Sequence, residues 1–303
     1  MNCVMRVRAF AKINLSLRVL GTRADGYHEL RTVFQSIALH DTLTIRAARG
    51  PFRLTCDDPD CPFDDTNLIW RAAARVWREA GRRGEPHGVA VDLKKRIPLE
   101  AGLGGGSSDA AAALRAFGHL WRVDEPRLRA IGGDLGADVP YFFEGGTVLG
   151  LERGDLLFPL IDRPAARVVL VLPDFGVSTK EAFGWWESSS ELRGLAEAPE
   201  ARSRQGRHRR GAPERGARRT FEMVNDLQAA VAAHYPEIAR LVRALRKAGA
   251  CHAAITGSGS TVFGLFGSQT GAATAARALA SRSRRTLVTR TLNRPQCQRL
   301  AAI

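Results

Sequence analysis

A glycine-rich segment, Pro98–Ser108, is the clearest sign of chemistry in the sequence. It reads PLEAGLGGGSS and leads directly into an alanine-rich run. Small residues let the main chain approach a ligand closely, and N–H groups at the start of a helix attract anions. The segment holds no lysine, which a Walker-type phosphate loop requires. It therefore predicts a phosphate site built from main-chain amides, with a plain structural turn as the alternative.

Two further segments carry side chains that could act beside such a loop. Lys12 and Asn14 lie two residues apart on the polar face of an alternating segment, and Asp138 lies in the short sequence GADVP. A carboxylate can serve as a general base, and a lysine can stabilise charge that develops during a reaction. Taken singly, Lys12 is more typical of a solvated strand surface and Asp138 of a hydrogen-bond anchor in a turn.

A metal site is only weakly indicated. Asp109 is expected in the first turn of the helix after the loop, where an acid suits the helix dipole. The same acid would repel a phosphate unless a cation intervened, which points to magnesium near Ser108 or Asp109. His28 has no partner at zinc-type spacing, and the cysteines form no CxxC pair. We expect structural or incidental thiols at Cys3, Cys56, Cys61, Cys251 and Cys297.

The elements that must position these residues follow from hydrophobic periodicity. Alternation over Ala11–Leu20 predicts a half-buried strand, and an apolar stripe predicts a helix that Asp65 or Thr66 caps and Gly81 ends. The sequence from Cys251 onward, CHAAITGSGSTVFGLF, predicts two strands around a tight loop. Other strands are expected near residues 41–46, 89–93, 147–151, 168–172 and 286–292, and helices directly after the glycine-rich loop and near 222–233, 236–249 and 271–281. Because strands and helices mix without the alternation of a doubly wound sheet, the fold class is α+β.

The positive charge is concentrated in two segments. The chain has 303 residues and a formal net charge of +14. Residues 201–219 hold eight arginines and one glutamate, and the segment from Ser281 holds six arginines and no acid. The remainder is nearly neutral, whereas a nucleic-acid groove would usually draw on basic residues throughout the folded part. We therefore expect a basic, flexible insertion at about 187–219, and a nucleic-acid partner is not favoured.

Length and hydropathy indicate two domains and argue against a membrane-spanning or secreted protein. The chain is long enough for two domains, with a change expected around Leu160–Pro164. No apolar run approaches the roughly 20 residues that span a bilayer. The amino-terminal segment alternates in polarity and has no signal-peptide pattern. A cytoplasmic protein without a membrane partner is expected, and nothing indicates its oligomeric state.

Four motifs occur in the order found in the GHMP kinases, a family of ATP-dependent small-molecule kinases. They are AKINLSLRVLGTRADGYHEL, PLEAGLGGGSSDAA, LGADVPYFF and TGSGSTVFGLF. The chain resembles this family over residues 5–186 and 220–292. The resemblance implies a two-domain α+β fold, with a ribosomal-protein-S5-like domain over 1–162 and a ferredoxin-like domain over 163–303. It also implies ATP as co-substrate, with magnesium.

The resemblance further implies individual roles. Lys12 and Asp138 match the catalytic positions. The positions that match ATP-binding residues are Asn67, Lys95, Pro98, Leu99, Glu100, Ala101, Gly102, Leu103, Gly104, Gly105, Gly106, Ser107 and Ser108. The positions that match substrate-binding residues are Asn14, Tyr27, His28 and Phe183. Tyr27 and Phe183 are expected to sandwich a pyrimidine while His28 contacts its polar edge.

Within the family, the sequences DGYH and TVFQSIALHDTLTI are similar to one branch. Its members phosphorylate the 2-hydroxyl of a methylerythritol unit joined to cytidine diphosphate, in the non-mevalonate route to isoprenoids. Three alternatives stay open: a family member that acts on another small alcohol, a non-catalytic binding protein with the same fold, and a nucleic-acid binder that uses the arginine segments.

Overall fold

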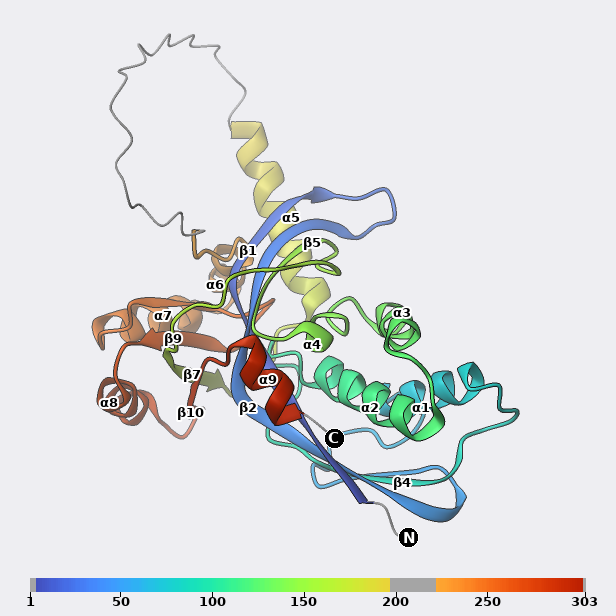
Figure 1. The fold of residues 1–303 in the computed structure, drawn as a ribbon. Helices are drawn as coiled ribbons and strands as arrows, with labels where there is room; N and C mark the ends of the chain where they lie inside the picture. Colours follow the sequence, from blue (N-terminus) through green and yellow to red (C-terminus); the bar gives the residue numbers. More distant parts are fainter. Residues whose placement is uncertain (1–3, 197–221, 302–303) are drawn as a thin grey trace, which may run out of the picture.

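The computed structural model describes residues 4–196 and 222–301, and two β-sheets form its centre (Figure 1). The first sheet has the strand order β3-β4-β2-β5-β6, and β1 also pairs with β2. Its strands are β1 Val4–Thr22, β2 His28–Pro51, β3 Arg53–Cys56, β4 His87–Lys94, β5 Thr147–Glu152 and β6 Leu156–Pro159. The second sheet has the order β10-β7-β9-β8. Its strands are β7 Arg167–Pro173, β8 His252–Ile255, β9 Val262–Phe266 and β10 Arg284–Arg290.

Helices cover both sheets. They are α1 Leu68–Glu79, α2 Gly105–Trp121, α3 Glu125–Leu135, α4 Tyr141–Glu144, α5 Thr179–Ala196, α6 Leu227–His234, α7 Pro236–Lys247, α8 Gln269–Leu279 and α9 Arg294–Ala301. Every predicted helix and strand is present, although β1 and β2 are longer than expected and α6 begins five residues later. The helices α3, α4, α5 and α9 and the strands β3 and β6 were not predicted.

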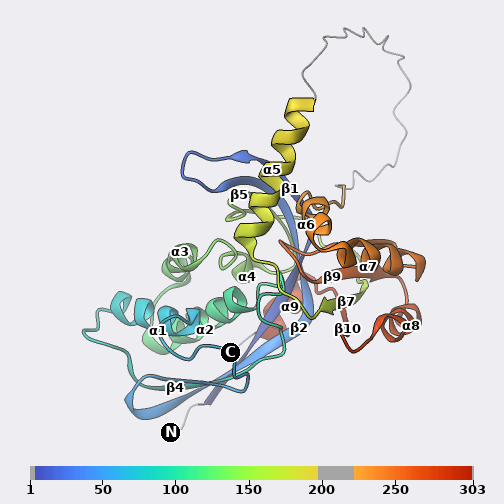
Figure 2. The same cartoon turned by 180° about the vertical axis from the view of Figure 1, so that it is seen from behind.

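Strand β1 enters the hydrophobic cores of both sheets. Ala9 packs in the core under α1 and α2, Ile13 in the core between the sheets, and Leu17 in the core that α6 and α7 cover. Figure 2 shows β1 and β2 running between the two groups of helices. The predicted half-buried strand is therefore wrong in one respect, because the polar residues Lys12 and Asn14 are buried as well. The predicted domain boundary falls between β6 and β7 and stays a prediction.

The structure describes the beginning of the predicted insertion and most of the basic carboxyl-terminal segment. Residues 187–196 continue helix α5, so the predicted flexible insertion begins too early, and residues 197–219 lie outside the described part of the chain. Near the carboxyl terminus, the Arg294 guanidinium donates to the carbonyl oxygens of Thr147 and Leu160. This arginine therefore fastens α9 to the first sheet. None of the described helices is long and apolar enough to cross a membrane.

Candidate active site

The side chains of Lys12 and Asp138 lie together although they are far apart in the sequence. Lys12 Nζ is 3.3 Å from Asp138 Oδ2, and it donates a hydrogen bond of 2.8 Å to Asn14 Oδ1. Strand β1 supplies Lys12 and Asn14, whereas Asp138 lies between α3 and α4. The Lys12 side chain is 5% exposed and that of Asp138 is 33% exposed. The carboxylate is thus the member of the ion pair that a ligand can reach more easily.

Asn14 is held from several sides, which fixes the direction of Lys12. Asn14 Nδ2 donates to Thr32 Oγ1 at 2.7 Å, and Thr32 Oγ1 donates to the carbonyl of Ser16. Because Thr32 Oγ1 is the acceptor for Asn14 Nδ2, the Asn14 amide is oriented with its oxygen toward Lys12, from which it accepts. The β1–β2 register shifts on both sides of Lys12–Asn14. Such irregularities commonly re-aim side chains next to functional sites.

Thr256, which precedes the turn between β8 and β9, was not identified from the sequence. Its Oγ1 accepts from the Asn14 main-chain N–H at 3.1 Å and lies 3.2 Å from the carbonyl oxygen of Gly102, to which it can donate. Asn225 supports this turn, because its side-chain amide donates to the carbonyls of Ile255 and Gly257. The motif TGSGSTVFGLF predicts a strand–loop–strand unit and is one of the four motifs of the resemblance, but neither interpretation predicts a contact with β1.

The glycine-rich loop packs directly against β1 and Thr256. The main-chain N–H of Lys12 donates to the carbonyl of Leu103 at 3.0 Å. Gly102 and Gly104 have φ of +71° and +70°, a conformation that favours glycine. A Cβ on Gly102 would lie 2.3 Å from the carbonyl oxygen of Thr256, and one on Gly104 would lie 3.1 Å from Lys12 Cγ. The loop therefore needs glycine at both positions to approach its neighbours.

Helix α2 begins inside the predicted loop. Its N-cap is Gly104, and among the described residues no side chain caps this end. An uncapped helix start leaves N–H groups available and carries a partial positive charge. A pocket of about 230 Å³ lies here and is lined by Leu68, Lys95 and residues 98–107. All predicted loop residues except Ser108 thus share one pocket, whose donors suit a phosphate.

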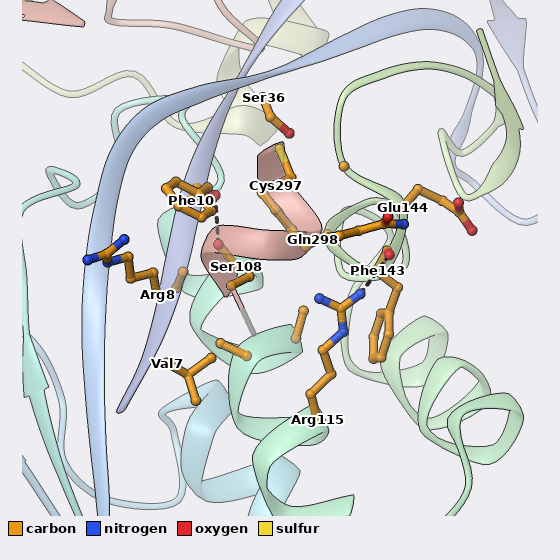
Figure 3. Close-up of a pocket in the computed structure, with 16 residues that line it drawn as sticks. Val7, Arg8, Phe10, Ser36, Ser108, Arg115, Phe143, Glu144, Cys297 and Gln298 are labelled. Carbon is orange, nitrogen blue, oxygen red and sulfur yellow. Dashed lines mark hydrogen bonds between the residues drawn. The ribbon is translucent and has the colours of Figure 1, made fainter. Parts of the chain in front are cut away.

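Ser108 lies on the other side of α2, in the small pocket that Figure 3 shows. Its hydroxyl donates to the carbonyl of Phe10 at 2.7 Å, and its main-chain N–H donates to Gly104 at 2.9 Å. This pocket has a volume of about 30 Å³ and is also lined by Arg115 and Cys297. The structure therefore differs from the expectation for Ser108, because both of its donors are already used.

Asn67 caps helix α1, in place of the predicted Asp65 or Thr66. Its side-chain oxygen accepts from the N–H of Ile69 at 2.8 Å, and its amide nitrogen donates to the carbonyl of Pro62 at 2.6 Å. Asn67 is next to Leu68, which lines the loop pocket. Its role in ATP binding stays a prediction.

Lys95 reaches the loop pocket, but its ammonium group is buried. Lys95 Nζ donates to Asp41 at 2.5 Å and to Asp109 at 2.8 Å. Burial lowers the pKa of Lys95, but the two carboxylates outweigh this and raise the pKa above its ordinary value. Burial raises the pKa of Asp109 to about 8; Lys95 opposes this rise, and the neighbouring Asp41 adds to it.

Asp109 is therefore not the first-turn acid that was expected. It belongs to the second turn of α2, and its side chain is 5% exposed. The described residues also contain no group of three or more His, Cys, Asp or Glu side chains that could hold a metal ion. Cys56, Cys61, Cys251 and Cys297 are free thiols, as predicted, and Cys3 lies outside the described residues.

The predicted catalytic and substrate-binding residues line a second, larger pocket of about 880 Å³. Its lining includes Lys12, Asn14, Tyr27, His28, Asp138 and Phe183. Gly102, Gly104 and Ser107 line both this pocket and the loop pocket. The two pockets therefore meet at the amino-terminal end of α2, with the Lys12–Asp138 pair beside the junction.

Aromatic residues gather in this larger pocket, away from the loop. The rings of His28 and Phe183 stack with centroids 4.3 Å apart and an interplanar angle of 19°. His28 Nε2 is 2.9 Å from Glu187 Oε1, and the guanidinium of Arg153 lies 5.4 Å from the centroid of the exposed Tyr27 ring. Phe183 thus stacks on His28 here, and the sandwich of a pyrimidine between Tyr27 and Phe183 stays a prediction.

Comparison with known proteins agrees with this geometry. The description "GHMP kinases N terminal domain" matches residues 67–146, and "GHMP kinases C terminal" matches residues 206–284. The 4-diphosphocytidyl-2-C-methyl-D-erythritol kinase of Moorella thermoacetica is 42% identical, with 95% of this chain and 99% of the relative covered. The protein of the same name from Pelotomaculum thermopropionicum is 41% identical, with 96% and 99% covered.

A solved structure supports the same assignment. The crystal structure of a 4-(cytidine 5'-diphospho)-2C-methyl-D-erythritol kinase matches with a TM-score of 0.74 and 32% identity, covering 95% of this chain and 99% of that one. The predicted α+β GHMP kinase fold is confirmed. The resemblance to one branch is confirmed as well, because identity of about 40% extends over nearly the full length of relatives with one name. The chain belongs to the 4-diphosphocytidyl-2-C-methyl-D-erythritol kinase family of GHMP kinases.

Proposed function

We propose that this kinase transfers the γ-phosphoryl group of ATP to the 2-hydroxyl of 4-diphosphocytidyl-2-C-methyl-D-erythritol. The observation that carries the proposal is the junction of two pockets beside Lys12 and Asp138. One pocket offers main-chain donors for a triphosphate, and the other offers aromatic rings for a pyrimidine. Phosphoryl transfer depends mainly on bringing two such ligands into line and on stabilising charge.

In this proposal Asp138 accepts the proton of the acceptor hydroxyl. The hydroxyl oxygen then bonds to the γ-phosphorus, the bond from that phosphorus to the β–γ bridging oxygen breaks, and ADP leaves. Lys12, held by Asn14, stabilises the negative charge on the reacting oxygens. The N–H groups at the start of α2 hold the phosphates in place. The loop itself has no lysine, and Lys12 of β1 supplies the positive charge instead.

Magnesium would take most of its ligands at this site from the nucleotide phosphates and water, and few from the protein. The ion commonly keeps several waters and binds substrate phosphates with few protein ligands. Ser108 and Asp109 do not suit it, because both side chains are buried, the Ser108 hydroxyl donates to Phe10 and Asp109 Oδ2 accepts from Lys95. Ser107 suits it better, since it is partly exposed and lines both pockets. When bound, magnesium would neutralise phosphate charge.

An assay of ADP release tests the proposal. Purified protein is given ATP, magnesium and one of three alcohols: 4-diphosphocytidyl-2-C-methyl-D-erythritol, mevalonate or homoserine. We expect turnover with the first, at least 100-fold above the other two in kcat/KM. Equal or better turnover of mevalonate or homoserine would overturn the substrate assignment. Absence of turnover with all three would favour the non-catalytic alternative, which the pairing of Lys12 with Asp138 argues against.

A further inference from the structure

A buried group of three charges lies below the phosphate loop and has no part in the mechanism above. Asp41 lies in the middle of β2, Lys95 directly follows β4, and Asp109 belongs to α2. The two carboxylates share the one ammonium group at 2.5 and 2.8 Å, and the three side chains are 0%, 3% and 5% exposed. We call these three residues the loop triad.

The loop triad holds the start of the loop. Asp41 Oδ1 accepts the main-chain N–H groups of Arg96 at 2.5 Å and Ile97 at 2.8 Å. The main-chain N–H of Lys95 donates to Asp57 at 2.7 Å. Every N–H from Lys95 to Ile97 is therefore engaged, immediately before the loop begins at Pro98. A segment fixed in this way leaves little freedom to the first loop residues.

The loop triad also holds the end of the loop. Asp109 lies one helical turn after Gly105 and binds Lys95 from inside α2. A Cβ on Gly105 would lie 3.3 Å from Lys95 Nζ, so the ammonium group lies directly beneath the first turn of the helix. Lys95 thus links the acid at the start of the loop to the acid at its end, and Asp41 and Asp109 also interact with each other directly.

We propose that Asp41, Lys95 and Asp109 are positioning residues that hold both ends of the phosphate loop, and that the Lys95 side chain acts on ATP through this frame, not as a direct ligand. The inference rests on the proposed function only in taking ATP as the ligand of the loop. For Lys95 Nζ to bind a phosphate, it would have to leave the fully buried Asp41 carboxylate without its cation and Asp109 without a hydrogen-bond donor. Uncompensated buried charge is strongly unfavourable.

The test compares Lys95→Met, Asp109→Asn and the double variant. Lys95→Met leaves the buried Asp41 and Asp109 side chains without their shared cation, so KM for ATP should rise at least tenfold. Asp109→Asn alone releases the end of the loop and should raise KM for ATP about threefold. In the Lys95→Met background the same substitution replaces a buried acid that has lost its cation by an amide, which can donate to Asp41, and should recover at least threefold in kcat/KM for ATP. If Lys95 were a direct ligand, Asp109→Asn could not recover this loss.

Amide hydrogen exchange without any ligand provides a readout that does not depend on turnover. Residues 102–108 should exchange at least tenfold faster in Lys95→Met and in Asp109→Asn than in the wild type. Lys94→Met, at an exposed neighbouring position, is the matched control and should change neither exchange nor KM. Unchanged exchange in Asp109→Asn, or no recovery in the double variant, would overturn the proposal. Because exchange is measured without substrates, these outcomes differ from a failure of the kinase assignment, which would abolish turnover in the wild type.

Discussion

Replacing Asp138 by asparagine removes the proton acceptor while keeping the size of the side chain. A positioned general base contributes about 10²–10⁴ in rate, so kcat should fall at least 100-fold, or by about 3 kcal/mol in activation free energy. The substitution also removes an ion pair with Lys12 of 3.3 Å. Because the Asp138 side chain is one-third exposed, solvent screens this pair, and the loss in unfolding free energy should be on the order of 1 kcal/mol.

The assay measures ADP release at saturating ATP and acceptor, together with thermal unfolding and the equilibrium affinity for ATP. We expect a large loss in kcat, a melting temperature within a few degrees of the wild type, and unchanged ATP affinity. Asp134→Asn is the matched control, since Asp134 is an exposed acid in α3 that pairs with Arg75 at 3.5 Å. A folded Asp138→Asn protein with kcat within threefold of the wild type would refute the general-base assignment.

Three further predictions concern the loop, the aromatic end of the pocket and the second sheet. Gly102→Ala places a Cβ 2.3 Å from the carbonyl oxygen of Thr256 at a φ of +71°, so we expect a loss of about 2 kcal/mol or more in unfolding free energy and a raised KM for ATP. Phe183→Ala removes the ring that stacks on His28, and should raise KM for the acceptor about two- to tenfold without changing KM for ATP. Burial lowers the pKa of His252 to about 4, below the ordinary 6.5, so the folded state binds fewer protons than the unfolded state between these values. The free energy of unfolding is therefore retained above pH 6.5 and falls by up to about 3 kcal/mol as the pH drops toward 4. Urea unfolding measured across this pH range should show that His252→Phe lacks this fall.

Local sequence pattern was sufficient to locate most elements and the loop, because periodicity and glycine content act over short distances. The same pattern could not predict the burial of β1. Alternation reports that one face of a strand is polar, and solvent is the usual partner of such a face. Here Lys12, Asn14 and Thr32 satisfy one another and the turn at Thr256, so the polar face is buried.

The loop triad could not be predicted for a different reason. Lys95 lies 54 residues from Asp41 and 14 from Asp109. No spacing rule joins these positions, and the surrounding KKR sequence is typical of a solvated surface. Only the antiparallel pairing of β2 with β4, together with the packing of α2, brings the three side chains together. The short helix α9 was missed because arginine and glutamine make it polar.

A loop without a lysine can still act on a triphosphate if a cation reaches it from elsewhere, and β1 provides this connection. The main chain of Lys12 binds the loop at Leu103, and its side chain passes Gly104 to reach Asp138. The next polar residue on the same face, Asn14, bonds through its main chain to Thr256 beside the second sheet. One strand therefore sets the distances among the phosphate donors, the cation and the carboxylate. A change in the register of β1 would disturb all three at once, whereas lysine within a mobile loop would fix only its own distance to the phosphates.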